Sequence, residues 1–112
     1  MSSHLTTHIL DSSTGAPAPD VAVRLSTASG SEIAAASTND DGRAALGPER
    51  LDAGDYTLTF ATGPYFAARG VDAFYPHVTV TFTVEVGDDG TSRHYHVPLL
   101  LSPFAYSTYR GS

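Results

Sequence analysis

The sequence predicts an all-β protein: a two-sheet antiparallel β-sandwich of seven or eight short strands with one short helix. Apolar and polar residues alternate in several short runs, clusters of turn residues separate these runs, and a single stretch has the start and stop residues of a helix. The chain has 112 residues, 41% hydrophobic and 16% charged, a composition typical of one globular domain. We therefore expect residues 1–112 to form a single domain.

Four strands are expected in the first half of the chain. The run at 21–26 is the clearest, because its three large apolar residues alternate with other residues and so share one face. A weaker, alanine-rich run ends in Asn39-Asp40-Asp41-Gly42, a strong turn signal. The four expected strands cover residues 5–11, 21–26, 32–38 and 56–60.

The only stretch with helical character is 64–69. Pro64 stands at its start and Gly70 just past its end, which is the usual order of helix start and stop residues. One short helix is expected there.

The longest alternation, at 77–86, is followed by turn residues at 87–90 and a second apolar run at 92–102, which together predict a β-hairpin. Pro98 lies inside the second arm and cannot donate a ladder hydrogen bond. We expect that arm to be bulged or unpaired on one side at Pro98. A final strand is expected at 105–110.

The formal net charge is −6, and all six basic side chains are arginines. An acidic surface binds polyanions poorly, so nucleic acids and anionic membranes are not expected as partners. The absence of cysteine excludes disulfides, thiolate metal sites and thiol nucleophiles. Residues 1–11 lack the pattern of a secretory signal, and no run approaches the roughly 18 apolar residues of a membrane helix. We expect a cytoplasmic protein.

The histidines are the most reactive side chains, because imidazole titrates near physiological pH. His94 and His96 are two residues apart on an expected strand, so both project from one face. Such a pair suits zinc binding or acid–base catalysis, or is simply half-exposed at the surface. Zinc would need further ligands from His4, His8 or carboxylates.

Arg43 follows the turn at Asp40-Asp41-Gly42. It either shields the two aspartates, a contact worth about 0–1 kcal/mol, or points at a planar anionic ligand that its guanidinium can hold by two hydrogen bonds. Asp88 and Asp89 stand between glycines and are interpreted as turn residues.

Three segments resemble the transthyretin-like 5-hydroxyisourate hydrolases. Residues 5–11, Leu-Thr-Thr-His-Ile-Leu-Asp, resemble the opening motif of this family, 38–43 resemble its central motif, and 94–112 are similar to its C-terminal signature almost throughout. Residues 102–108 also resemble transthyretin itself, a hormone carrier, and therefore indicate the fold rather than the activity. The ending Tyr109-Arg110-Gly111-Ser112 resembles the hydrolases and not the carrier.

The resemblance implies a transthyretin-like sandwich that assembles as a homotetramer, a dimer of dimers with active sites at the subunit interface. It implies hydrolysis of 5-hydroxyisourate to 2-oxo-4-hydroxy-4-carboxy-5-ureidoimidazoline, on the route from urate to allantoin, with neither cofactor nor metal. The catalytic residues that it implies are His8, Arg43, His96 and Ser112. The substrate-binding residues that it implies are His8, Arg43, Tyr109, Arg110 and His94.

The chemistry of ring opening agrees with this set, since a base must deprotonate water and donors must stabilise the developing oxyanion. Either His96 or His8 is expected as the base, with Arg43 holding the substrate. His77 departs from the family, which often has an acidic residue there, and is expected to be a surface substitution. His4 lies outside the matched motif and is expected to be dispensable.

Two other functions compete with the hydrolase. A transthyretin-type carrier of a hydrophobic ligand would need neither the C-terminal tetrapeptide nor the set of His8, Arg43 and His96. A zinc-binding sandwich would use His8, His94 and His96 and would be distinguished by treatment with a chelator.

Overall fold

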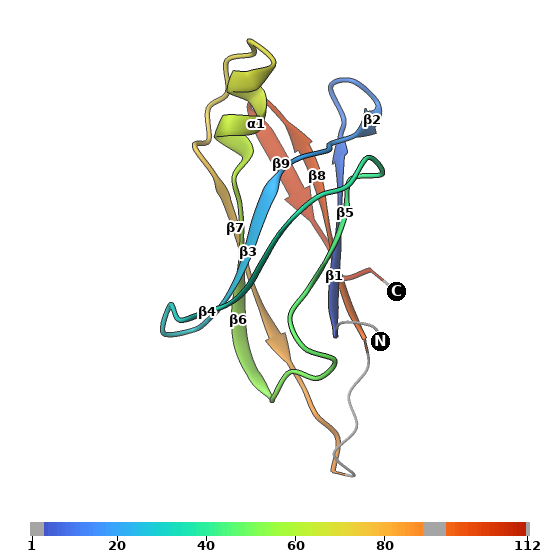
Figure 1. Cartoon of the computed structure of the whole chain (residues 1–112), viewed down its shortest axis with the longest axis vertical. Coiled ribbons are helices and arrows are strands. Elements are labelled where there is room, and N and C mark those ends of the chain that lie inside the picture. Colours follow the sequence, from blue (N-terminus) through green and yellow to red (C-terminus); the bar gives the residue numbers. More distant parts are fainter. Residues whose placement is uncertain (1–3, 89–93, 112) are drawn as a thin grey trace.

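The computed structural model describes residues 4–88 and 94–111, which form two β-sheets packed face to face with one helix at one end (Figure 1). This confirms the predicted all-β sandwich. The first sheet has the order β2-β1-β8-β9, with β5 also pairing with β1, and the second has the order β4-β3-β6-β7. The strands of the first sheet are β1 (Leu5–Asp11), β2 (Ala16–Pro17), β5 (Arg43–Leu46), β8 (Tyr95–Ser102) and β9 (Ala105–Thr108). Those of the second sheet are β3 (Ala22–Thr27), β4 (Glu32–Ser37), β6 (Gly54–Phe60) and β7 (Val78–Val84).

The core lies between the sheets, because alternate residues of the central strands point inward. In β1 the burial alternates from Leu5 to Asp11, with Leu5 and Ile9 fully buried. In β6, Leu58 and Phe60 face them from the other sheet and are also fully buried. The opposite faces of both sheets are left to solvent or to partners.

The helix α1 (Thr62–Ala68) begins two residues before the predicted start and ends one residue before the predicted end. Gly70 follows with a φ of 68°, the left-handed conformation typical of a residue after a helix. Tyr65 and Phe66 bury one side of α1 against the core. The Tyr65 hydroxyl donates a 2.8 Å hydrogen bond to Oδ2 of Asp11, which ties the helix to the end of β1.

The predicted hairpin of residues 77–86 and 92–102 is wrong. β7 pairs with β6 in the second sheet, whereas β8 pairs with β1 and β9 in the first, so the chain crosses between the sheets after β7. Part of the expected turn, at 89–93, lies outside the described residues. The pairing of β8 with β1 is parallel, while all other strand pairs among the described residues are antiparallel.

The prediction for Pro98 is confirmed. On the side of β8 that faces β9, the paired residues end at Leu99 and Thr108, and Pro98 has no partner there. An isolated bridge between His96 and Gly111 follows in the same register. The Thr108 hydroxyl donates to the Pro98 carbonyl at 2.7 Å.

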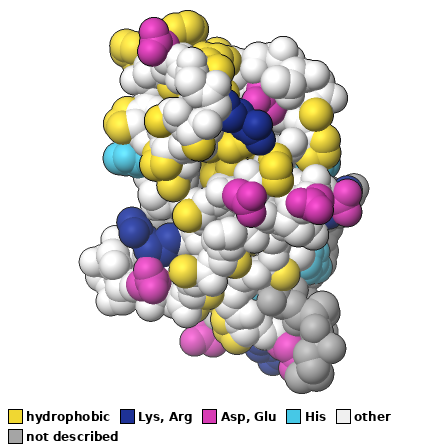
Figure 2. All heavy atoms as spheres, turned by 45° about the horizontal axis from the view of Figure 1, so that its top comes forward, with side chains coloured by type: hydrophobic (Ala, Val, Ile, Leu, Met, Phe, Trp, Pro, Cys, Tyr) yellow, Lys and Arg dark blue, Asp and Glu magenta, His cyan; other side chains and the backbone are white. Residues whose placement is uncertain are grey.

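On the face seen in Figure 2, acidic and basic side chains stand scattered among other atoms rather than gathered into an extended patch of one charge. Among the described residues, no helix has the length and apolar character needed to cross a membrane.

Candidate active site

The candidate active site starts from the outer face of β1. Leu5, Thr7 and Ile9 point into the core, so the alternation turns Thr6 and His8 outward, where both are half-buried. Two polar side chains therefore stand on the open face at the centre of this sheet.

A tight turn places Arg43 beside His8. Oδ1 of Asn39 accepts hydrogen bonds from the backbone N–H groups of Asp41 and Arg43, both at 3.0 Å. Gly42 has a φ of 75°, and a Cβ there would come within 2.5 Å of the Ile9 carbonyl oxygen, so the turn requires glycine. β5 begins directly after it, and Arg43 pairs with His8 across the strands.

Arg43 makes no ion pair within 4 Å with Asp40 or Asp41, all three of which are described. The guanidinium is exposed on the open face of the sheet. This arrangement favours the second interpretation of Arg43, in which it serves a ligand rather than its neighbouring aspartates.

β8 and the residue before it bring His96 and His94 to the same place from the other side of β1. His96 pairs with Thr6 in the parallel ladder. The Thr6 hydroxyl lies 2.8 Å from Nδ1 of His96 and 2.8 Å from Nε2 of His94. The prediction that the two histidines share a face is confirmed by this common partner.

These side chains line a pocket of about 290 Å³ on the outer face of the sheet. Its lining residues are Thr6, Thr7, Arg43, Ala44, His94 and His96. His8 lies next to the pocket, paired with Arg43. Three neighbouring strands thus contribute a cation, two imidazoles and a hydroxyl to one small cavity.

The surroundings of His96 favour its neutral form. Burial, followed by the positive charge of Arg43 and by His8 and His94, lowers the pKa of His96 below its ordinary value of 6.5. Since Nδ1 is occupied by Thr6, Nε2 is the nitrogen left for water or substrate. A neutral imidazole in this position can act as a general base at neutral pH.

The C-terminal segment packs directly on His96. The Gly111 N–H donates to the His96 carbonyl at 2.8 Å, and a Cβ at position 111 would lie 2.5 Å from Cδ2 of the His96 ring. The Arg110 guanidinium stacks over the Tyr95 ring, 4.6 Å from its centroid. Arg110 therefore anchors the segment that holds Gly111 against the imidazole.

Tyr109 and Arg110 are not brought into the histidine pocket within this chain. Both line a separate pocket of about 300 Å³ between the second sheet and the end of β9, together with Phe82 and Tyr95. Ser112, expected to be catalytic, lies outside the described residues. Of the expected site residues, the structure gathers His8, Arg43, His94 and His96.

Two further histidines lie elsewhere. His77 is exposed, as expected of a surface substitution. His4 is 5% exposed, and its Nδ1 accepts a 2.6 Å hydrogen bond from the Leu51 N–H. His4 is therefore a structural residue of the sandwich. The expectation that it is dispensable applies to activity and not to stability.

Thr6 is the site residue whose contact the sequence did not reveal. Its only signal was its position two residues before His8, on the same face of the strand. The geometry of a zinc site is not found either: among the described residues, no group of three or more histidine, aspartate or glutamate side chains is placed to hold a metal ion.

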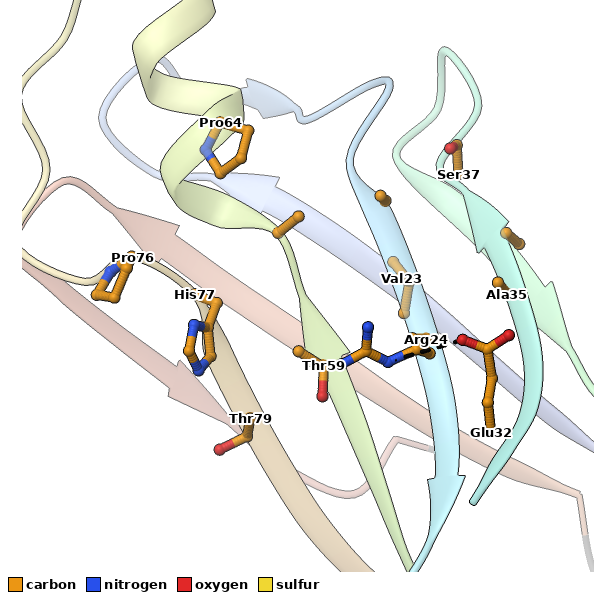
Figure 3. A pocket seen from close by; sticks show the side chains of 13 residues that line it. Val23, Arg24, Glu32, Ala35, Ser37, Thr59, Pro64, Pro76, His77 and Thr79 are labelled. Atoms are coloured by element: carbon orange, nitrogen blue, oxygen red, sulfur yellow. Dashed lines mark ion pairs between the residues drawn. The ribbon is translucent and has the colours of Figure 1, made fainter. Parts of the chain in front are cut away.

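A larger pocket, of about 790 Å³, lies on the outer face of the second sheet below α1 (Figure 3). The Arg24 and Glu32 side chains meet there as an ion pair at 3.8 Å, each more than half exposed. Small side chains such as Ala35, Ser37 and Thr59 line much of the rest. The groove has one histidine, His77 (Figure 3), whereas the smaller pocket brings together Arg43, His94 and His96.

Comparison with known proteins identifies the class to which this fold and site belong. Residues 5–111 match the family model described as the HIUase/Transthyretin family, and the chain belongs to that family. A 5-hydroxyisourate hydrolase from Salmonella dublin is 46% identical over 113 residues, which cover 96% of this chain and 80% of that protein. The 5-hydroxyisourate hydrolase of Mus musculus is 43% identical, with 99% of this chain and 97% of that protein covered.

Solved structures agree. The 5-hydroxyisourate hydrolase of Klebsiella pneumoniae superposes with a TM-score of 0.85 at 41% identity, covering 96% of this chain and 92% of that one. Sea bream transthyretin, solved in complex with thyroxine, has a TM-score of 0.84 at 34% identity, covering 96% and 93%. The fold is thus shared by 5-hydroxyisourate hydrolases and by a transthyretin that binds thyroxine, so the fold alone does not distinguish the two functions.

Proposed function

We propose that this protein hydrolyses 5-hydroxyisourate to 2-oxo-4-hydroxy-4-carboxy-5-ureidoimidazoline, a step between urate and allantoin. The observation that carries the proposal is the convergence of His8, Arg43 and His96 on one face of three adjacent strands. The names of the relatives that are 43–46% identical support the same activity.

The roles follow from the chemistry of the groups. His96, held neutral by its surroundings, deprotonates the attacking water through Nε2. Arg43 donates to the substrate and stabilises the negative charge that develops on the attacked carbonyl oxygen. His8 stands beside Arg43 and binds the same planar ring. Within one chain Tyr109 and Arg110 line a separate pocket, so we propose that they and Ser112 complete the wall of the site at a subunit interface.

We further propose that the protein is a homotetramer in which the open face of the first sheet meets a partner. Leu100, on β8, is 36% exposed and Tyr109 is 58% exposed, which supports burial of this region in an assembly. Light scattering after size exclusion measures this directly: a mass of four chains is expected, and a monomer at micromolar concentration would contradict it.

The test of the activity is a coupled spectroscopic assay. Urate oxidase generates 5-hydroxyisourate in place, and its decay is followed with and without this protein. A decay that accelerates in proportion to the protein concentration is expected. A decay equal to the spontaneous rate would reject the hydrolase.

A carrier function is the alternative that the likeness to sea bream transthyretin raises. A carrier would bind thyroxine stoichiometrically without turnover of 5-hydroxyisourate. Charged and imidazole groups in the pocket disfavour the apolar iodinated rings of such a ligand, since binding would strip these groups of water without replacing their hydrogen bonds. Titration with thyroxine alongside the coupled assay separates the two functions.

A further inference from the structure

Thr6 contacts both histidines of the site through one oxygen atom. Its Oγ1 lies 2.8 Å from Nδ1 of His96 and 2.8 Å from Nε2 of His94. A hydroxyl has one proton to donate, and a neutral imidazole has one N–H and one lone pair. With both rings neutral, the hydroxyl proton satisfies only one of the two facing nitrogens, so the other nitrogen must carry a proton of its own.

Two arrangements are therefore possible. In the first, Nδ1–H of His96 donates to Thr6, the Thr6 proton points to Nε2 of His94, and Nε2 of His96 keeps a free lone pair. In the second, the Thr6 proton points to Nδ1 of His96, Nε2–H of His94 donates to Thr6, and Nε2 of His96 carries a proton. Because both hydrogen bonds share one oxygen, the protonation of His96 depends on that of His94.

We propose that Thr6 is a positioning residue that joins His96 to His94 in a proton relay. In this relay His96 exchanges protons with the substrate, while His94 takes up the positive charge. The inference rests on the hydrolase function proposed above. The first arrangement prepares His96 as a base, and the second prepares it as an acid.

As water attacks the carbonyl carbon, its proton enters Nε2 of His96, Nδ1 of His96 passes its proton to Thr6, and Thr6 passes its own proton to Nε2 of His94. His94 keeps its proton on Nδ1 and becomes the imidazolium. When the ring C–N bond breaks, its electron pair goes to nitrogen, which takes the proton from Nε2 of His96 while the relay runs backward. The second hydrogen of the water leaves when the new carboxylic acid ionises, so each turnover releases one net proton.

The environments of the two rings fit this division. His96 is half-buried, and Arg43, His8 and His94 all disfavour a positive charge on it. His94 is exposed, so solvent can stabilise an imidazolium there and exchange protons with it. A relay that transfers the charge from His96 to His94 moves it from the less favourable position to the more favourable one.

The experiment compares Thr6→Val, which removes the hydroxyl at nearly constant volume, with Thr6→Ser, which keeps it. Acid–base contributions are typically about 10²–10⁴-fold, so we expect kcat of Thr6→Val to fall at least about tenfold with little change in KM. Thr6→Ser should stay within about threefold of the wild type. The matched control is Thr57→Val, since Thr57 is a half-buried strand threonine whose hydroxyl bonds that of Thr81 at 3.0 Å in the other sheet.

A second measurement does not depend on turnover. Nitrogen-15 NMR of the imidazole rings reports which nitrogen of each histidine is protonated. In the wild type, the His94 and His96 signals should titrate together, and in Thr6→Val they should titrate independently. His94→Gln, a change at an exposed position, should lower kcat and be partly restored by added imidazole, which can accept the proton instead.

Three results would overturn the relay: wild-type kcat in Thr6→Val, equal losses in Thr6→Val and Thr6→Ser, or linked titration that survives in Thr6→Val. Hydrolysis that persists unchanged in Thr6→Val overturns the relay alone. A wild-type protein without hydrolase activity overturns the proposed function and, with it, the catalytic role of the relay.

Discussion

Gly111 lies against the imidazole of His96 so closely that any side chain at position 111 would displace one of them. A Cβ there would be 2.5 Å from Cδ2 and 3.2 Å from Cγ of the ring. The requirement comes from this contact and not from a left-handed backbone, because Gly111 has no positive φ. The ring of His96 is thus held by Thr6 through Nδ1 and by Gly111 along its Cδ2 edge.

Gly111→Ala should therefore damage activity more than stability. The added methyl must push the His96 ring or the C-terminal segment aside, and displacements of about 1 Å at reacting groups cost on the order of 10²-fold in rate. We expect kcat/KM to fall by about that factor in the coupled assay, with a small change in thermal midpoint. Gly30→Ala is the opposite control. A Cβ at position 30 would meet no atom within 4 Å, but the φ of 94° strains any residue other than glycine. Stability should therefore fall and activity should not.

The pH dependence of activity should report His96. Because its folded pKa lies below 6.5, the neutral base persists below that pH, and kcat/KM should fall only as the pH drops through the lowered value. The coupled assay between pH 5 and 8 measures the midpoint. A midpoint above 6.5 would contradict His96 as the base.

Arg43→Gln tests the charge beside His96. Loss of a preorganised donor to the oxyanion costs about 10²–10³-fold, so kcat/KM should fall by that factor. Since Arg43 helps to lower the pKa of His96, the acid midpoint of the remaining activity should move upward. Arg24→Gln, which changes an exposed arginine of the other sheet, should leave both quantities unchanged.

Asp11→Asn should weaken the link between β1 and α1. Burial alone raises the pKa of Asp11, but hydrogen bonds from Ser13, Tyr65 and Thr14 outweigh this and lower it. A hydrogen bond to a charged group contributes about 1.5–3 kcal/mol, so we expect the free energy of unfolding at pH 7 to fall by about 2 kcal/mol.

The sign of the pH effect follows from linkage. The folded pKa of Asp11 lies below its unfolded value, about 3.9, so its contribution is complete above that pH and is lost as the pH falls through the folded value. The wild type should lose more stability than Asp11→Asn below about pH 4 in urea denaturation series. Asp72→Asn, at an exposed position, is the matched control and should behave as the wild type.

Alternation along the chain predicted which residues face the core but not which sheet a strand joins. Val78 and Val84 of β7 and Val97 of β8 all point inward, yet they do so from opposite sheets. A hairpin and a crossing between two layers have the same alternating pattern, because both bury every second residue. The turn residues after β7 therefore predicted a hairpin that the sheet topology excludes.

The candidate site could be predicted only in part for the same reason. His8, Arg43 and His96 were found from their motifs, and the common face of His94 and His96 from alternation. The contact of Thr6 with two histidines depends on the parallel register that sets Thr6 opposite His96, about 90 positions along the chain. A single sequence contains no local signal for such a pairing.

That parallel pair also sets the order in which the molecule can fold. β1 and β8 are neighbours at the centre of their sheet but are separated by most of the chain, so β1 must wait, with its β8 edge unpaired, until the C-terminal strands are present. Folds dominated by such distant pairings form in milliseconds to seconds, and an unpaired edge favours aggregation meanwhile. Formation of the first sheet and of the Thr6–His96 contact should therefore share one rate constant, since docking of β8 completes both in the same event.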